Sequence, residues 1–219
     1  MTKYQDQTLS VTERVEALMA EMIPAEKVAQ LWGVWAIALL DERRQFIPER
    51  QPELLKHGVG QISRLGANAL VNPTHVAALA NQIQHYFIEQ TRLGIPVMIH
   101  EESCAGILMR GATTFPQSIG QAATWNPDLI EAMTRAMREQ LRAVGAHHAL
   151  APVLDVVHDA RWGRVEETYG EDPFLISALG TAYVRGLQGD DLKTGIAATA
   201  KHFVGYAASE GGMNWAPSH

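Results

Sequence analysis

The sequence has a single cysteine, Cys104, among its 219 residues. One thiol excludes an internal disulfide bond and a cysteine-based zinc site, and it fits a reducing compartment. No run approaches the roughly 18 apolar residues that a membrane span needs. The first ten residues, MTKYQDQTLS, also lack the apolar core of a signal peptide. We therefore expect a cytoplasmic protein with no membrane partner.

Concentrated positive charge is missing as well. Eighteen basic and twenty-four acidic residues give a net charge of −6, and no basic cluster is denser than Arg43-Arg44. This pattern argues against nucleic acid as a partner. The nine histidines form no HExxH or His-x-His pattern, and adjacent His147 and His148 would point to opposite faces of a strand. We expect no metal, and no cofactor, because no glycine-rich phosphate fingerprint follows any expected strand.

A hydrophobic content of 47% is enough to bury one sizeable core. Ser10 and Glu13 form a capping box ahead of an amphipathic helix, and a second helix is expected to begin at Pro24. We expect residues 1–58 to be a helical lead-in that precedes the first strand. This lead-in would belong to the same domain as the rest of the chain.

From residue 59 onward, apolar strands alternate with helices. Strands are expected at 59–63, 96–100, 149–154 and 196–201, and an Asx-Pro pair opens a helix at residues 72, 126 and 172. Near-continuous apolar strands alternating with helices predict an α/β fold with a parallel sheet of four strands. Polar residues lie at the C-terminal end of each of these strands, namely Arg64, His100-Glu101-Glu102, Asp155 and Lys201-His202.

Polar residues at one end of several parallel strands are typical of the active face of a (β/α)8 TIM-type barrel. A complete barrel typically needs about 250 residues. The chain would therefore hold only about the first four β/α units. Taken alone, Glu102 could be a solvated loop carboxylate, and Lys201-His202 could be an ion pair beside a satisfied histidine.

Five motifs together narrow the interpretation. They are IHEES at 99–103, ATTFPQSIG at 112–120, RWGR at 161–164, GEDP at 170–173 and KHFVGY at 201–206. In this order and spacing, the sequence resembles the N-terminal domain of glycoside hydrolase family 3, from about Leu9 to the last residue. The resemblance implies that residues 1–219 are an incomplete N-terminal part of that barrel domain, with 1–58 as its lead-in.

The resemblance implies four substrate-binding residues: Glu102, Arg164, Lys201 and His202. Many relatives have Asp where this chain has Glu102, which would alter how far the carboxylate reaches toward the sugar. Arg164 is eight residues before the Asp of GEDP, the position of the sugar-binding arginine. An arginine there could instead pair with a carboxylate such as Glu171.

Arg161 is then expected to be structural, paired with Asp155 or Asp159. Nucleophilic catalysis by Cys104 has little support, because the residue lacks any local protease signature, and we expect it to be a small loop residue. Among the tryptophans, Trp162 and Trp215 in the active-face loops are candidates to stack on sugar rings. The other three, at 32, 35 and 125, are expected to serve in packing.

Retaining glycosidases need a nucleophile and an acid/base, and the resemblance places both beyond His219. We therefore expect no catalytic residue in this chain, which would be inactive alone. The resemblance implies that the complete relative would hydrolyse a terminal β-linked sugar with retention. Glucose or xylose is favoured, because KHFVGY lacks the histidine-bearing loop of the family's N-acetylglucosaminidases. Two alternatives stay open: a non-catalytic sugar-binding or regulatory fragment, and a half-barrel enzyme that uses Glu102 and Asp155.

Overall fold

The computed structural model describes residues 2–69 and 72–218. Within them, five strands pair in parallel in chain order, β1-β2-β3-β4-β5. They are β1 (Gly33–Trp35), β2 (Gln61–Ser63), β3 (Met98–Glu101), β4 (His148–Ala149) and β5 (Ala197–Ala198). Strands in sequential order match the wall of a (β/α)8 barrel, whereas a doubly wound sheet reverses its order. The expected domain span of 1–219 includes residues 1, 70, 71 and 219, which lie outside the described part.

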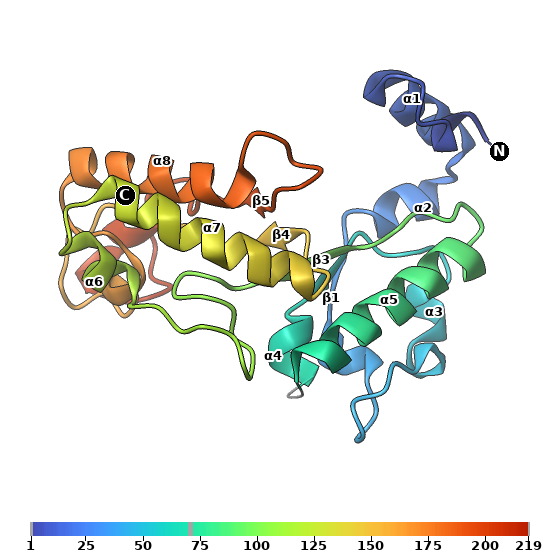
Figure 1. The fold of residues 1–219 in the computed structure, drawn as a ribbon, viewed down its shortest axis with the longest axis horizontal. Helices are drawn as coiled ribbons and strands as arrows, with labels where there is room; N and C mark the ends of the chain where they lie inside the picture. The colour runs from blue at the N-terminus through green and yellow to red at the C-terminus, as the bar shows by residue number, and fades with distance from the viewer. Residues whose placement is uncertain (1, 70–71, 219) are drawn as a thin grey trace.

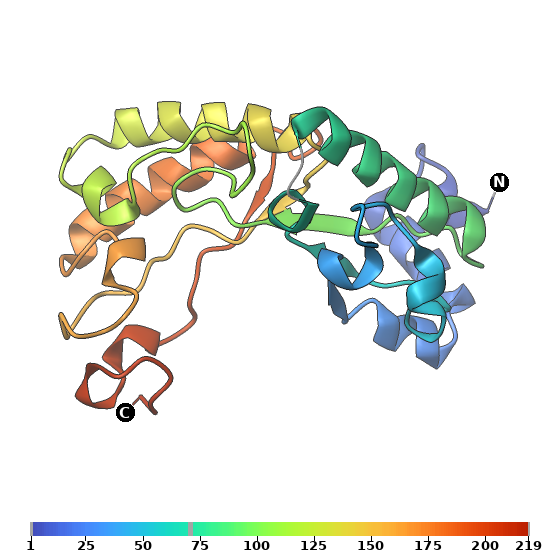
Figure 2. The same ribbon diagram turned by 90° about the horizontal axis from the view of Figure 1, so that it is seen from below.

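Eight α-helices accompany this sheet in the described part of the chain (Figures 1 and 2). In chain order they are α1 (Val11–Glu21), α2 (Pro24–Ala29), α3 (Pro52–Leu55), α4 (Leu65–Ala69), α5 (Pro73–Gln90), α6 (Ser118–Ala122), α7 (Pro127–Ala143) and α8 (Pro173–Gln188). Figure 2 shows α5, α7 and α8 running along the outer face of an arched sheet. An outer layer of helices around a parallel sheet is the arrangement of a barrel segment.

The predicted helix starts are confirmed in their capping chemistry. The side chains of Asn72 and Asn126 accept hydrogen bonds from backbone N–H groups three residues onward, and Asp172 accepts one from Phe174. A proline follows each cap at the first helical position, where its missing N–H costs nothing. Local sequence therefore determines where α5, α7 and α8 begin.

The predicted count of four strands is wrong, because β1 lies inside the expected lead-in. Val34 of β1 pairs with Ile62 of β2, so residues 33–35 belong to the sheet. Helices α1 and α2 do precede the first strand, but that strand is β1 and not 59–63. Three residues are too few to show alternation, and the apolar sequence continues directly into a 3₁₀ turn at Ala36–Leu39.

Strands β4 and β5 are shorter than the predicted ranges of 149–154 and 196–201. Pro152 has no N–H to donate to the ladder, and pairing resumes as an isolated bridge between Val153 and Lys201. The Lys201 N–H donates to the Pro152 carbonyl at 3.0 Å. The two chain segments thus stay side by side and bring residues 155 and 201 to the same end of the sheet.

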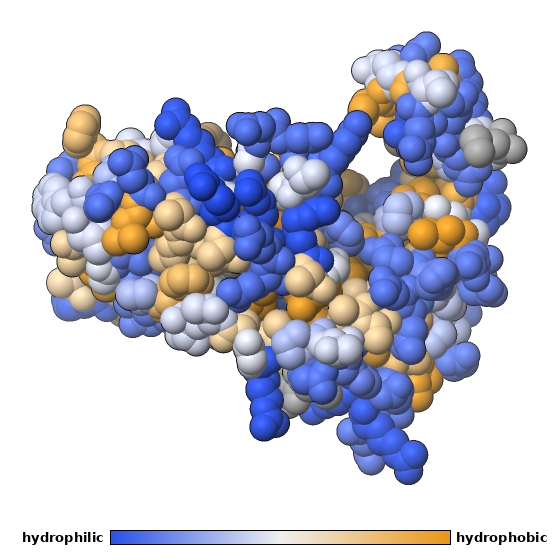
Figure 3. Space-filling view, viewed as in Figure 1, coloured by the Kyte–Doolittle hydropathy of each residue, from blue (hydrophilic) through white to orange (hydrophobic). Residues whose placement is uncertain are grey.

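Some apolar side chains remain uncovered by the described residues. In the view of Figure 3, orange side chains are visible over α1 and α2. On these two helices, Val11 is 73% exposed and Val28 60% exposed, and Leu31 just after α2 is 89% exposed. No helix in the described part of the chain is long and apolar enough to cross a membrane.

Candidate functional site

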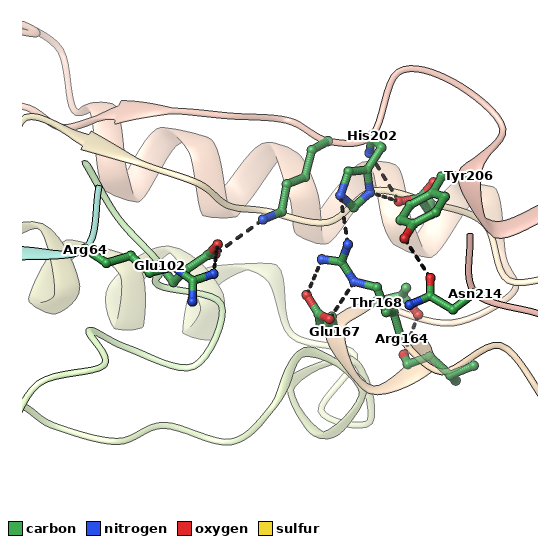
Figure 4. Close-up of polar contacts among 11 residues, drawn as sticks. Arg64, Glu102, Arg164, Glu167, Thr168, His202, Tyr206 and Asn214 are labelled. Atoms are coloured by element: carbon green, nitrogen blue, oxygen red, sulfur yellow. Dashed lines mark hydrogen bonds and ion pairs between the residues drawn. The ribbon is translucent and has the colours of Figure 1, made fainter. Parts of the chain in front are cut away.

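The polar strand ends meet in one pocket, as predicted from their position on the sheet. The pocket has a volume of about 570 Å³. All four expected substrate-binding residues line it, together with Arg64 and Glu167. Figure 4 shows Arg64 and Glu102 on one side of the close-up and Arg164, Glu167 and His202 on the other. The geometry therefore brings together side chains that are far apart in sequence.

Glu102 is held between two cations. Its Oε1 accepts from Arg64 Nη2 at 2.8 Å, and its Oε2 accepts from Lys201 Nζ at 3.3 Å. The side chains of Glu102 and Lys201 are only 19% and 13% exposed. Pairing of this kind offsets the cost of placing charged groups away from bulk water. Each carboxylate oxygen keeps a further lone pair for a hydroxyl group of a ligand.

Glu101 and Glu102 point to different environments, as the alternation of a strand predicts. Glu101 is 1% exposed, and its Oε1 accepts from the backbone N–H of Gly66 at 2.6 Å. Burial raises the pKa of Glu101 to about 7, while the Gly66 hydrogen bond opposes this rise. Glu102 faces the pocket, whereas Glu101 contacts the start of α4.

We expect replacement of Glu101 by glutamine to remove a pH-dependent loss of stability. Because burial raises the pKa of Glu101 from 4.5 to about 7 on folding, the folded chain binds this proton more tightly. The free energy of unfolding should therefore fall as the pH rises through that window, by about 3 kcal/mol. Urea unfolding at about pH 5 and about pH 8 measures the fall.

The exposed Glu139 provides the control for this experiment. Glu139→Gln should keep the wild-type fall in stability, and Glu101→Gln should lose it. A fall of the same size in both variants would show that other groups produce the pH dependence.

Arg164 is oriented by a carboxylate three residues away. Its Nε and Nη2 donate to Glu167 Oε1 and Oε2 at 2.7 and 2.6 Å, a bidentate pair. This bond raises the pKa of Arg164 and lowers the pKa of Glu167, so both groups stay charged. The carboxylate that pairs with Arg164 is thus Glu167, and not Glu171 as the alternative interpretation suggested. The pair leaves Arg164 Nη1 directed at His202.

His202 links Arg164 to a buried carboxylate. Its Nδ1 lies 2.7 Å from Asp155 Oδ2, and its Nε2 lies 3.2 Å from Arg164 Nη1. Because a guanidinium can only donate, Nε2 accepts and Nδ1 carries the hydrogen that it donates to Asp155. The imidazole edge is thus fixed from both sides, and the Asp155 side chain is only 2% exposed.

Arg161 lies outside this network. Its guanidinium forms a bidentate pair with Asp159, with Nη2 to Oδ2 at 2.6 Å, and its side chain is 72% exposed. The predicted pairing with Asp159 is confirmed, and Asp155 binds His202 instead. The two arginines of RWGR therefore have separate partners, and only Arg164 lines the pocket.

The stacking role predicted for Trp162 is wrong, whereas the same role for Trp215 stays a prediction. Trp162 is 2% exposed and packs edge-on against Tyr206, so its ring cannot stack on a sugar, whereas Trp215 is 83% exposed. The three tryptophans expected to serve in packing, at 32, 35 and 125, are 59%, 54% and 68% exposed. Aromatic residues near short strands and loops give no periodic signal that separates packing from exposure.

Arg64 and Glu167 line the pocket, although neither was predicted from the sequence to have a site role. Arg64 was recognised only as a polar strand end, and Glu167 was not singled out. The spacing of three residues between Arg164 and Glu167 is a signal that could have identified this ion pair. Cys104 also lines the pocket, and burial raises the pKa of its thiol to about 11. A protonated thiol at neutral pH is a poor nucleophile.

The fold and the pocket define an α/β protein of the (β/α)8-barrel type with a polar site at the carboxyl ends of its strands. The glycosyl hydrolase family 3 N-terminal domain matches residues 24–219, and the chain belongs to this family. This finding confirms the resemblance drawn from the five motifs.

Known relatives cover the same region. A β-xylosidase of Formosa agariphila is 44% identical over 133 residues, 56% of this chain and 18% of that protein. A periplasmic β-glucosidase/β-xylosidase of Dickeya chrysanthemi is 29% identical over 98% of this chain and 35% of that protein. The structure of a β-glucosidase from Erythrobacter marinus matches with a TM-score of 0.87 and 34% identity, over 99% of this chain and 29% of that chain. The chain thus spans about a third or less of the length of these relatives.

Proposed function

We propose that this chain forms the sugar-holding part of a retaining β-glucosidase or β-xylosidase. The observation that carries the proposal is Glu102, which lies between Arg64 and Lys201 in a pocket that also contains His202 and Arg164. A carboxylate accepts hydrogen bonds through its free lone pairs, and a guanidinium donates them through its N–H groups. Together they suit the vicinal hydroxyls of a sugar. The substrate would be a terminal β-linked glucose or xylose.

The chemistry of bond cleavage requires more than this pocket. A retaining mechanism needs two carboxyl groups about 5 to 5.5 Å apart, one as nucleophile and one as acid/base. Three glutamates line the pocket, and two of them, Glu102 and Glu167, already bind cations of this chain, so Glu166 alone cannot supply both groups. We propose that residues 1–219 are one part of the barrel domain, and that the two catalytic carboxyl groups come from elsewhere in the complete protein.

A half-barrel enzyme that uses Glu102 and Asp155 is less well supported. Asp155 is buried beneath His202, binds both its ring and its backbone N–H, and does not line the pocket. A non-catalytic sugar-binding or regulatory role uses the same pocket and remains the second candidate. Because one relative is named as periplasmic, the cytoplasmic location stays a prediction from the sequence.

Titration of the chain with glucose and with xylose tests the proposal. We expect amide chemical shifts to change at the ends of β2, β3 and β5 in a saturable way, because the ligand contacts side chains at these three strand ends. Sorbitol, an acyclic polyol with similar hydroxyl groups, is the control and should bind more weakly. Equal responses to all three compounds, or none to either sugar, would contradict a sugar site.

A further inference from the structure

Arg64 occupies a place in the pocket to which neither the motifs nor the comparisons assign a role. It directly follows β2, and its backbone has a left-handed φ of 56°. Its N–H donates to the His100 carbonyl at 2.8 Å, which anchors the backbone to β3. This conformation directs the side chain toward Glu102 instead of along the strand.

The guanidinium of Arg64 has a second support on the neighbouring strand. Trp35, the last residue of β1, pairs in register with Ser63, so its indole lies next to Arg64. The guanidinium carbon lies 5.1 Å from the centre of the indole ring. A cation held over an aromatic face loses little freedom when it forms a hydrogen bond, because the stacking already restricts it. The Arg64 side chain is 34% exposed, which leaves it accessible from the pocket.

We propose that Arg64 is a positioning residue of the sugar site and acts through Glu102. The Glu102 side chain is longer than the Asp of many relatives and has more rotamers. Lys201 alone, with its own flexible side chain, would not hold Glu102 in one of them. Arg64 binds the other carboxylate oxygen and fixes the plane of the carboxylate, so its free lone pairs meet the same sugar hydroxyls in every encounter. The inference rests on the proposed function, because it names how the same pocket recognises its ligand.

The test is a double-mutant cycle on sugar binding by the chain. Arg64→Ala should weaken glucose binding about tenfold, and Arg64→Lys should restore only part of it, because lysine lacks the planar fork. In a Glu102→Ala background, Arg64→Ala should cost nothing further. A full tenfold loss in that background would overturn the inference and make Arg64 a direct ligand of the sugar.

Monodeoxyglucoses supply a readout that a purely structural role would not change. In the wild-type chain, the deoxy analogue that lacks the hydroxyl read by Glu102 should bind weakly. Arg64→Ala and Glu102→Ala should both lose discrimination against that same analogue. Retained discrimination in Arg64→Ala would overturn the inference.

Arg44 provides the matched control, because it also has a left-handed backbone, with φ 61°, and does not line the pocket. Arg44→Ala should leave glucose binding and deoxy discrimination unchanged. If wild-type chain binds glucose and Arg64→Ala binds it equally, only the role of Arg64 is refuted. If the wild-type chain binds neither glucose nor xylose, the proposed function itself fails, and this inference with it.

Discussion

The 219-residue chain should hydrolyse neither aryl β-glucosides nor aryl β-xylosides above background, even if it binds the sugar as we propose. Enzymes of this kind accelerate hydrolysis by about 10⁶-fold or more, and most of that factor depends on the two catalytic carboxyl groups. Glu102 binds Arg64 and Lys201, and Glu167 binds Arg164, so neither is free to act as nucleophile or acid. The third pocket glutamate, Glu166, cannot supply both groups alone. Release of nitrophenol from the two nitrophenyl glycosides measures the rate.

Size-exclusion chromatography should accompany this assay to measure whether the chain self-associates. Strands β1 and β5 are the two edges of the described sheet, and unpaired edges favour self-association. We expect the chain to elute larger than a monomer or to be poorly soluble. Robust turnover by a well-behaved monomer would contradict the proposal and make carboxylates such as Glu102 and Asp155 the catalytic pair.

Lys201→Ala should lower kcat/KM on the order of 10²-fold when it is made in a complete enzyme that contains this segment. Lys201 is 13% exposed and lies 3.3 Å from Glu102 Oε2, so its removal deletes a cation from the pocket and releases one side of Glu102. Hydrogen bonds that strengthen in the transition state affect kcat as well as KM. Steady-state kinetics with a nitrophenyl glycoside measure both parameters.

Arg161→Ala is the control for this variant, because Arg161 pairs with Asp159 and its side chain is 72% exposed. We expect Arg161→Ala to leave kcat within a factor of about two, since an exposed ion pair contributes little to stability. Equal losses of kcat in the two variants at unchanged melting temperature would refute the distinction between them.

The sequence was most informative where a local rule determines the structure. Asn72, Asn126 and Asp172 begin helices because a capping side chain followed by proline needs no tertiary contact to favour a helix. Strand β1 escaped detection because three residues carry no periodicity and are fixed by pairing with β2. The lengths of the strands depend on which backbone groups form hydrogen bonds across the sheet, and these pairings cannot be derived from the sequence.

The same division applies to the site. Glu102, Lys201 and His202 could be placed on one face because the carboxyl ends of parallel strands meet there. The ion pairs and hydrogen bonds within the pocket could not be predicted, because they depend on side-chain geometry. Arg164 pairs with Glu167, and Asp155 pairs with His202. Exposure of single tryptophans likewise depends on what the loops cover.

The contacts of Glu102 also bear on the order in which the chain can fold. Its partners Arg64 and Lys201 lie 38 residues before it and 99 residues after it. Contacts of such long sequence separation form slowly, because large loops must close before they contribute. During synthesis, the pocket can be completed only after Lys201 has left the ribosome, so recognition of sugar should be among the last properties this chain acquires.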